Sequence, residues 1–176
     1  TPFEHMKLRL LNASHSALAY LGYLAGHETI ASTMTDVRFA ALARQIMDDA
    51  APTLTMPSGT DIAAYAASLL QRFANPALHH RTWQIAMDGS QKLPQRLLAT
   101  MQDRLRLGLS IDTHALAVAA WMRYVTAKDE QGRAIDVRDP LAKELFEITE
   151  RAGPVAERLA PALLEVHSIF GALGSD

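Results

Sequence analysis

The 176-residue sequence contains no cysteine, no long hydrophobic run and no block of basic residues. The absence of cysteine excludes a disulfide scaffold and a thiolate metal site. The 17 lysines and arginines are dispersed and are balanced by 19 acidic residues, which argues against a nucleic-acid footprint. The most apolar stretch, 17–25, is much shorter than the roughly 18 residues that indicate a membrane span. We therefore expect a protein that binds neither nucleic acid nor membrane, and the composition is compatible with a cytoplasmic location.

The histidines do not form a recognisable metal site. Seven are present, but no pair lies four residues apart on one helix, and the adjacent His79 and His80 point to different faces. Without cysteine a zinc site is therefore not expected, and we predict no metal cofactor. The chain begins with Thr1 rather than Met and shows no signal peptide, so we expect it to be part of a longer protein.

Helical periodicity runs through almost the whole chain, because apolar residues recur at spacings of three and four. No sustained alternation indicates a strand, so the fold class we predict is all-α, with one domain over residues 1–176. We expect about eight helices: one from Pro2 to Gly22 or Gly26, one capped by Thr35 or Asp36, one capped by Asp61, one from Pro76 to Met87, one from Pro94 to Gly108, one from Thr113 to Val125, one from Leu141 to Gly153, and one that ends near Leu173.

Three polar side chains stand out on the first predicted helix. At about 100° per residue, Lys7 lies at 0°, His15 at roughly 80° and Asn12 at roughly 140°, and the rest of the helix is largely apolar. Buried polar groups need partners, and a ligand hydroxyl or carbonyl could be one. The alternative is that a solvated lysine and two structurally satisfied side chains share this helix by chance.

These three residue types suit hydride transfer between an alcohol and a nicotinamide. Oxidation of a secondary alcohol needs a base that takes the hydroxyl proton, and a lysine such as Lys7 can supply it. The amide of Asn12 can donate to the developing alkoxide, as in an oxyanion hole. His15 can form a hydrogen bond with a neighbouring hydroxyl or with the reacting oxygen.

Residues 2–16 resemble the signature of the mannitol dehydrogenase family, the polyol-specific long-chain dehydrogenases/reductases. The family pattern is Lys, four residues, Asn, two residues, His, and Lys7, Asn12 and His15 match it at the same spacing. Ala13 stands where many members have glycine. Weaker resemblances cover residues 72–76, 88–92, 121–124 and 139–141, so that the likeness extends over most of the chain.

The resemblance implies a helical C-terminal substrate domain with a fold like that of the 6-phosphogluconate dehydrogenase C-terminal domain. It implies Lys7 as general acid/base, Asn12 as the group that stabilises the oxyanion, and His15 as the residue that orients the substrate. Lys92 is a candidate contact for a substrate carboxylate or hydroxyl. His80, Arg81 and Gln84 are weaker candidates, and we favour a surface role for the last two.

Family members bind NAD mainly through an N-terminal Rossmann domain. This sequence has no G-x-G-x-x-G fingerprint, so that domain is absent from it, and we expect the chain alone to bind NAD weakly and to have no turnover. The expected partners are therefore a small sugar acid or polyol and the Rossmann domain of the parent chain.

The substrate is suggested by residues 75–96 and 121–141, which most resemble members that interconvert D-mannonate and D-fructuronate. Mannitol 2-dehydrogenase activity and tagaturonate reductase activity are the alternatives within the family. A non-catalytic helical interaction domain is the alternative from another class, because fold alone does not determine function. Such a domain gives no reason for Lys7, Asn12 and His15 to occur together.

Overall fold

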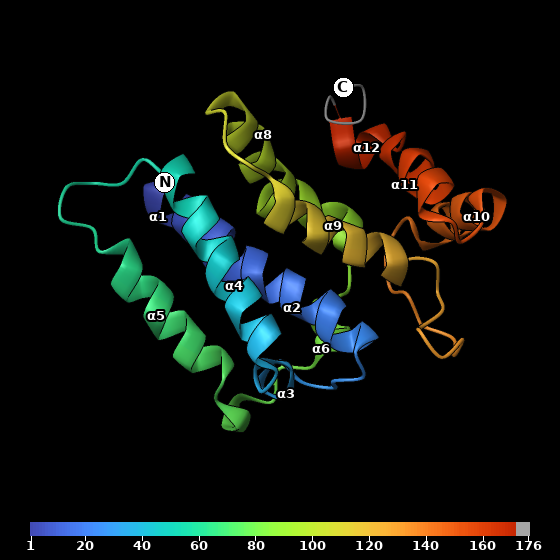
Figure 1. Cartoon of the computed structure of the whole chain (residues 1–176), viewed down its shortest axis with the longest axis horizontal. Helices are drawn as coiled ribbons and strands as arrows, with labels where there is room; N and C mark the ends of the chain where they lie inside the picture. Colours follow the sequence, from blue (N-terminus) through green and yellow to red (C-terminus); the bar gives the residue numbers. More distant parts are fainter. Residues whose placement is uncertain (172–176) are drawn as a thin grey trace.

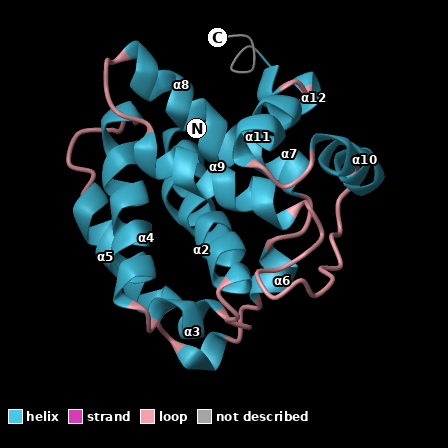
Figure 2. Cartoon of the chain, turned by 45° about the vertical axis from the view of Figure 1, so that its right-hand side comes forward, coloured by secondary structure: helices cyan, strands magenta, loops and turns pink. Residues whose placement is uncertain are grey.

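The computed structural model describes residues 1–171, which form an all-helical domain with short connecting loops (Figures 1 and 2). Within these residues the only β-type pairings are two isolated bridges, Thr29–Arg81 and Lys128–Ala134. The elements are α1 Pro2–Met6, the π-helical segment η1 Lys7–Asn12, α2 Ala13–Leu24, α3 Ile30–Met34, α4 Val37–Ala50, the 3₁₀ turn η2 Ala51–Thr53, α5 Ile62–Phe73, the 3₁₀ turn η3 Pro76–Leu78, α6 Thr82–Ile85, α7 Gly89–Leu93, the π-helical segment η4 Pro94–Leu98, α8 Ala99–Arg106, α9 Asp112–Tyr124, α10 Ala142–Ala152, α11 Ala156–Leu164 and α12 His167–Phe170. The predicted all-α class is confirmed.

Helix α2 is the centre of the domain, with α4 and α9 on either side of it and α6 near its C-terminal end (Figure 1). It lacks a polar face over much of its length, and Leu18, Ala19 and Tyr20 are fully buried. A helix that is apolar on most sides must be surrounded by others, because exposed apolar surface costs free energy. Helices α10, α11 and α12 pack at the opposite end of the domain from α5 (Figure 1).

Side-chain N-caps begin several helices at the predicted residues. The Thr1 hydroxyl accepts from the backbone N–H of Glu4, and the Glu4 side chain completes the capping box. Asp36 accepts from the N–H of Arg38, and Asp61 caps α5. The first long helix ends just before Gly26, whose φ of 90° suits glycine.

The predicted helix from Pro76 to Met87 is wrong. A 3₁₀ turn forms instead over Pro76–Leu78, His79 takes a left-handed conformation with φ 47°, and only the short helix α6 follows. The cause is tertiary: Ile30 N–H donates to the His80 carbonyl and Thr82 N–H donates to the Glu28 carbonyl. These two bonds hold the backbone extended between η3 and α6.

Two further helix boundaries differ from the prediction. Pro94 does not begin a helix but lies inside the continuous run α7–η4–α8, and Gly108, with φ 70°, follows its end as expected. The last predicted helix is divided into α11 and α12 by a break at Glu165 and Val166. Its expected end at Leu173 lies outside the described residues.

No helix in residues 1–171 combines the length and apolar character needed to cross a membrane. The same part of the chain holds no group of three or more histidine, aspartate or glutamate side chains that could bind a metal ion.

Candidate active site

Lys7, Asn12 and His15 lie on one continuous helical run, α1–η1–α2, but the run is not a regular α-helix. Over Lys7–Asn12 it widens into a π-helix, in which Ala13 N–H donates to the Leu8 carbonyl, five residues back. In a π-turn the residue five positions along, rather than four, stacks on the first. Asn12 is therefore nearer to the face of Lys7 than the roughly 140° of a regular α-helix implies.

Lys7 is exposed and Asn12 is partly exposed, at the solvent-facing side of this run. Neither side chain has a hydrogen bond or ion pair with any residue between 1 and 171. The ammonium and the amide are therefore open to a molecule that approaches this face.

His15 sits deeper, between aromatic rings from other elements. Its ring stacks on Phe73 of α5, with centroids 5.1 Å apart and planes 4° from parallel, and meets the edge of His80 at 5.4 Å. Its Nε2 atom is buried and has no hydrogen-bond partner in the described part of the chain. Burial is the main cause that lowers the pKa of His15 to about 4, and the charges of His80 and Arg96 contribute to the same shift, so the ring is neutral at neutral pH.

Three basic side chains lie near enough to His15 for their charges to act on it: Arg72, Lys92 and Arg96, here called the basic cluster. The charge of each one disfavours protonation of His15. None of the three forms an ion pair within residues 1–171, although most other arginines do. Charges that lack a counter-ion in the protein are available to a ligand anion.

The two half-buried members of the basic cluster lie four residues apart on the α7–η4 run. Lys92 Nζ donates to the Ile85 carbonyl at 3.3 Å, and Arg96 Nη1 donates to Ser16 Oγ at 3.0 Å. Burial, followed by the charge of Arg96, lowers the pKa of Lys92, while Asp88 and Asp139 act in the opposite direction. Burial also lowers the pKa of Arg96. The guanidinium of Arg96 keeps its positive charge at neutral pH, and burial strengthens the attraction of a charged group for an anion.

Asp139 fixes the start of the α7–η4 run, which carries Lys92 and Arg96. Its carboxylate accepts from the backbone N–H of Ser90 at 2.8 Å and from the Ser90 hydroxyl. Gly89 is needed next to it, because a Cβ there would lie 2.5 Å from both Trp121 Nε1 and the Tyr20 hydroxyl. The sequence blocks 88–92 and 139–141 are thus parts of one structural unit.

The structure brings some of the predicted site residues together and separates others. The ring of His80 contacts that of His15, and the charge of Lys92 acts on His15. Arg81 instead lines a separate cavity of about 640 Å³ between the end of α2, the start of α6 and the loop at 129–134. Gln84 is exposed on α6, away from this cavity lining. Both side chains are exposed, and the surface role that we favour for them stays a prediction.

Arg72, Phe73 and Arg96 were missed as site residues. Arg96 had a usable signal, because it follows Lys92 by four residues and therefore shares its face on a helix. Arg72 and Phe73 reach His15 from α5, more than fifty residues along the chain, and no local pattern indicates that contact.

The helical arrangement identifies the class of domain. The chain superposes with a TM-score of 0.89 and 36% identity on the solved structure of Pseudomonas fluorescens mannitol 2-dehydrogenase in ternary complex with NAD and D-mannitol, over 97% of this chain and 34% of that one. It matches the family described as the mannitol dehydrogenase C-terminal domain over residues 1–176. The chain belongs to this family.

Curated relatives include one named for a sugar acid and one named for a polyol. D-mannonate oxidoreductase of Escherichia coli is 56% identical over 96% of this chain and 35% of its own length. Mannitol 2-dehydrogenase of Phaeosphaeria nodorum is 36% identical over 96% of this chain and 29% of its own length. The chain thus spans about a third of the length of the relatives it matches.

Proposed function

We propose that this chain is the substrate domain of a two-domain NAD-dependent oxidoreductase that interconverts D-mannonate and D-fructuronate. The remaining domain, of the Rossmann type, binds the dinucleotide, because residues 1–171 contain no strand that could build a Rossmann cradle. When bound there, NAD supplies the hydride acceptor. The observation that supports a sugar-acid substrate is the basic cluster, because none of its three cations forms an ion pair within residues 1–171.

The proposed chemistry assigns one task to each side chain of the first helix. The neutral amine of Lys7 accepts the proton of the reacting hydroxyl while hydride leaves the same carbon, so that the C–OH group becomes a carbonyl. In the opposite direction the Lys7 ammonium returns the proton to the carbonyl oxygen. The Asn12 amide donates to that oxygen as negative charge develops on it. Exposure of both groups on one π-turn supports this assignment.

His15 and the basic cluster hold the substrate away from the reacting carbon. The buried Nε2 of His15 lacks a partner, and a substrate hydroxyl would satisfy it. Because the pKa of His15 is about 4, its neutral ring donates from one nitrogen and accepts at the other. Arg72, Lys92 and Arg96 then face the substrate carboxylate, which a polyol lacks.

The substrate assignment is tested with the intact two-domain parent. We expect NAD-linked kcat/KM for D-mannonate to exceed that for D-mannitol by about 10²-fold or more, because D-mannitol lacks the carboxylate that the basic cluster would bind. D-altronate carries the same carboxylate, so its comparison with D-mannonate tests which sugar acid the site prefers. Equal or faster oxidation of D-mannitol would shift the assignment to a polyol substrate and leave the basic cluster unexplained. Preference for D-altronate would support the tagaturonate alternative and keep the carboxylate site.

A further inference from the structure

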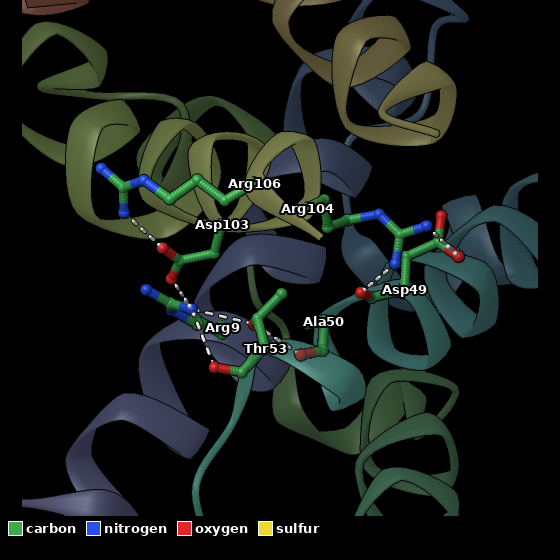
Figure 3. A network of polar contacts seen from close by, with 7 residues as sticks. All are labelled: Arg9, Asp49, Ala50, Thr53, Asp103, Arg104 and Arg106. Atoms are coloured by element: carbon green, nitrogen blue, oxygen red, sulfur yellow. Dashed lines mark hydrogen bonds and ion pairs between the residues drawn. The ribbon is translucent and has the colours of Figure 1, made fainter. Parts of the chain in front are cut away.

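One side chain of the π-turn that carries Lys7 and Asn12, Arg9, forms hydrogen bonds with distant parts of the domain (Figure 3). One terminal nitrogen of Arg9, Nη1, donates to Thr53 Oγ1 at 2.8 Å and to the Thr53 carbonyl at 3.3 Å. The same nitrogen pairs with Asp103 Oδ2 at 2.7 Å. The Arg9 side chain is only 11% exposed, so solvent screens these bonds weakly.

Both anchors of Arg9 are themselves fixed. The Thr53 hydroxyl donates to the Ala50 carbonyl at 2.7 Å, which ties η2 to the end of α4. Asp103 also accepts from Arg106 at 3.0 Å and lies on α8, the continuation of the run that carries Lys92. Arg9 therefore links the π-turn to two other parts of the domain (Figure 3).

A π-turn is rare and is intrinsically less favourable than an α-turn, so it needs tertiary support to persist. Arg9 lies between Lys7 and Asn12 in sequence and inside the same turn. We propose that Arg9 is a positioning residue: its bonds to Thr53 and Asp103 hold the π-turn in the geometry that presents Lys7 and Asn12 to one substrate oxygen. This inference rests on the proposed function of those two residues.

Arg104 provides a matched control for Arg9. It lies on α8, the helix that also carries Asp103. Its side chain is 8% exposed, its Nε donates to the Ser110 carbonyl at 2.6 Å, and it pairs with Asp49 at 3.8 Å (Figure 3). It thus joins α8 to α4 and to the loop after α8. None of its bonds reaches η1. Loss of Arg104 weakens the packing of the domain without releasing the π-turn.

The test compares Arg9→Met and Arg104→Met in the intact two-domain parent, with D-mannonate and NAD. For Arg9→Met we expect kcat to fall by about 10–100-fold while KM changes by less than about threefold, since small misplacement of a catalytic group mainly affects the chemical step. The midpoint of the kcat–pH profile should also move, because the surroundings of Lys7 change. Arg9→Lys should recover part of kcat, because its ammonium keeps the positive charge and three donors but lacks the planar, delocalised guanidinium of arginine.

For Arg104→Met we expect the urea midpoint of unfolding to fall about as much as in Arg9→Met. Its kcat should stay within about threefold of wild type. Asp103→Asn removes one anchor and leaves Thr53, so it should lower kcat in the same direction as Arg9→Met but less. If Arg9→Met folds poorly, Asp103→Asn still tests the positioning role of Arg9.

Three results would overturn the inference. If kcat falls in proportion to the loss in urea midpoint in both Arg9→Met and Arg104→Met, Arg9 has only a structural role. An unchanged kcat and pH midpoint in Arg9→Met, beside an inactive Lys7→Ala, would remove the positioning role and leave the proposed function intact. Normal turnover by Lys7→Ala would contradict both the positioning role of Arg9 and the proposed catalytic role of Lys7.

Discussion

Replacement of Lys7 by alanine in the intact two-domain parent should lower kcat for D-mannonate oxidation by about 10²–10⁴-fold, the usual contribution of a general acid/base. The effect should be confined to the chemical step, because Lys7 is exposed and makes no bond with residues 1–171 that its loss would break. KM and the thermal midpoint should therefore change little. The measurement is steady-state NADH formation, accompanied by a thermal melt of each variant.

Lys143→Ala is the matched control for this prediction. Lys143 is 92% exposed on α10, far along the chain from the first helix, and pairs only weakly with Glu147 at 4.0 Å. Its removal should leave kcat unchanged. Near-normal turnover by Lys7→Ala would mean that Lys7 is an ordinary surface lysine and that another group moves the proton.

The stability of the domain should fall as pH is lowered from about 6.5 to about 4, and His114 should be a main cause. This residue of α9 is fully buried, and neither ring nitrogen has a partner in the described part of the chain. Burial lowers its pKa from 6.5 to about 4; the nearby Arg104 and Arg9 also lower it, and Asp49 opposes them. The folded His114 thus stays neutral where the unfolded one takes up a proton.

The sign follows from that difference in proton binding. Above pH 6.5 both states of His114 are neutral and it has no effect on stability. Between pH 6.5 and 4 only the unfolded state binds the proton, so the free energy of unfolding decreases as pH falls. The decrease is about 2 kcal/mol by pH 5 and about 3 kcal/mol by pH 4. His15, whose pKa is also about 4, should add a similar effect.

His114→Leu isolates this contribution. An apolar side chain of similar size fits a site where the ring makes no hydrogen bond, and it does not titrate. Urea unfolding of the 176-residue chain at pH 7 and pH 5 should show a difference about 2 kcal/mol smaller in the variant than in wild type. His167→Leu, at an exposed position on α12, should leave the difference unchanged. If the free energy of unfolding falls by the same amount from pH 7 to pH 5 in wild type and in His114→Leu, His114 is not neutral in the folded domain.

Sequence reasoning predicted those features that depend on neighbouring residues. The capping box at Thr1 and the caps at Asp36 and Asp61 involve partners two or three residues away, so their pattern is visible in the sequence. The all-helical class followed from apolar spacing for the same reason. The grouping of Lys7, Asn12 and His15 on one helix was also local.

Features that depend on distant contacts were not predictable in this way. The π-turn at Lys7–Asn12 is held by Arg9 through partners 44 and 94 residues away. The extended backbone before α6 depends on bonds to residues around Thr29, more than fifty positions earlier, and it is this segment that carries His80 to His15. The prediction of a helix from Pro76 onward missed that contact, because nothing in the sequence of residues 76–87 indicates that this segment bonds to residues 28–30.

The most direct test of the account removes one charge of the basic cluster and compares two substrates. In the intact parent, Lys92→Met should lower kcat/KM for D-mannonate by about 10-fold or more, as expected for loss of a charged contact, and lower that for D-mannitol much less. Lys128→Met, at an exposed position outside the cluster, is the control and should alter neither substrate. A selective loss with D-mannonate would support a carboxylate bound between His15 and the basic cluster. An equal loss with both substrates would contradict that site, and with it the assignment of a sugar acid as the substrate.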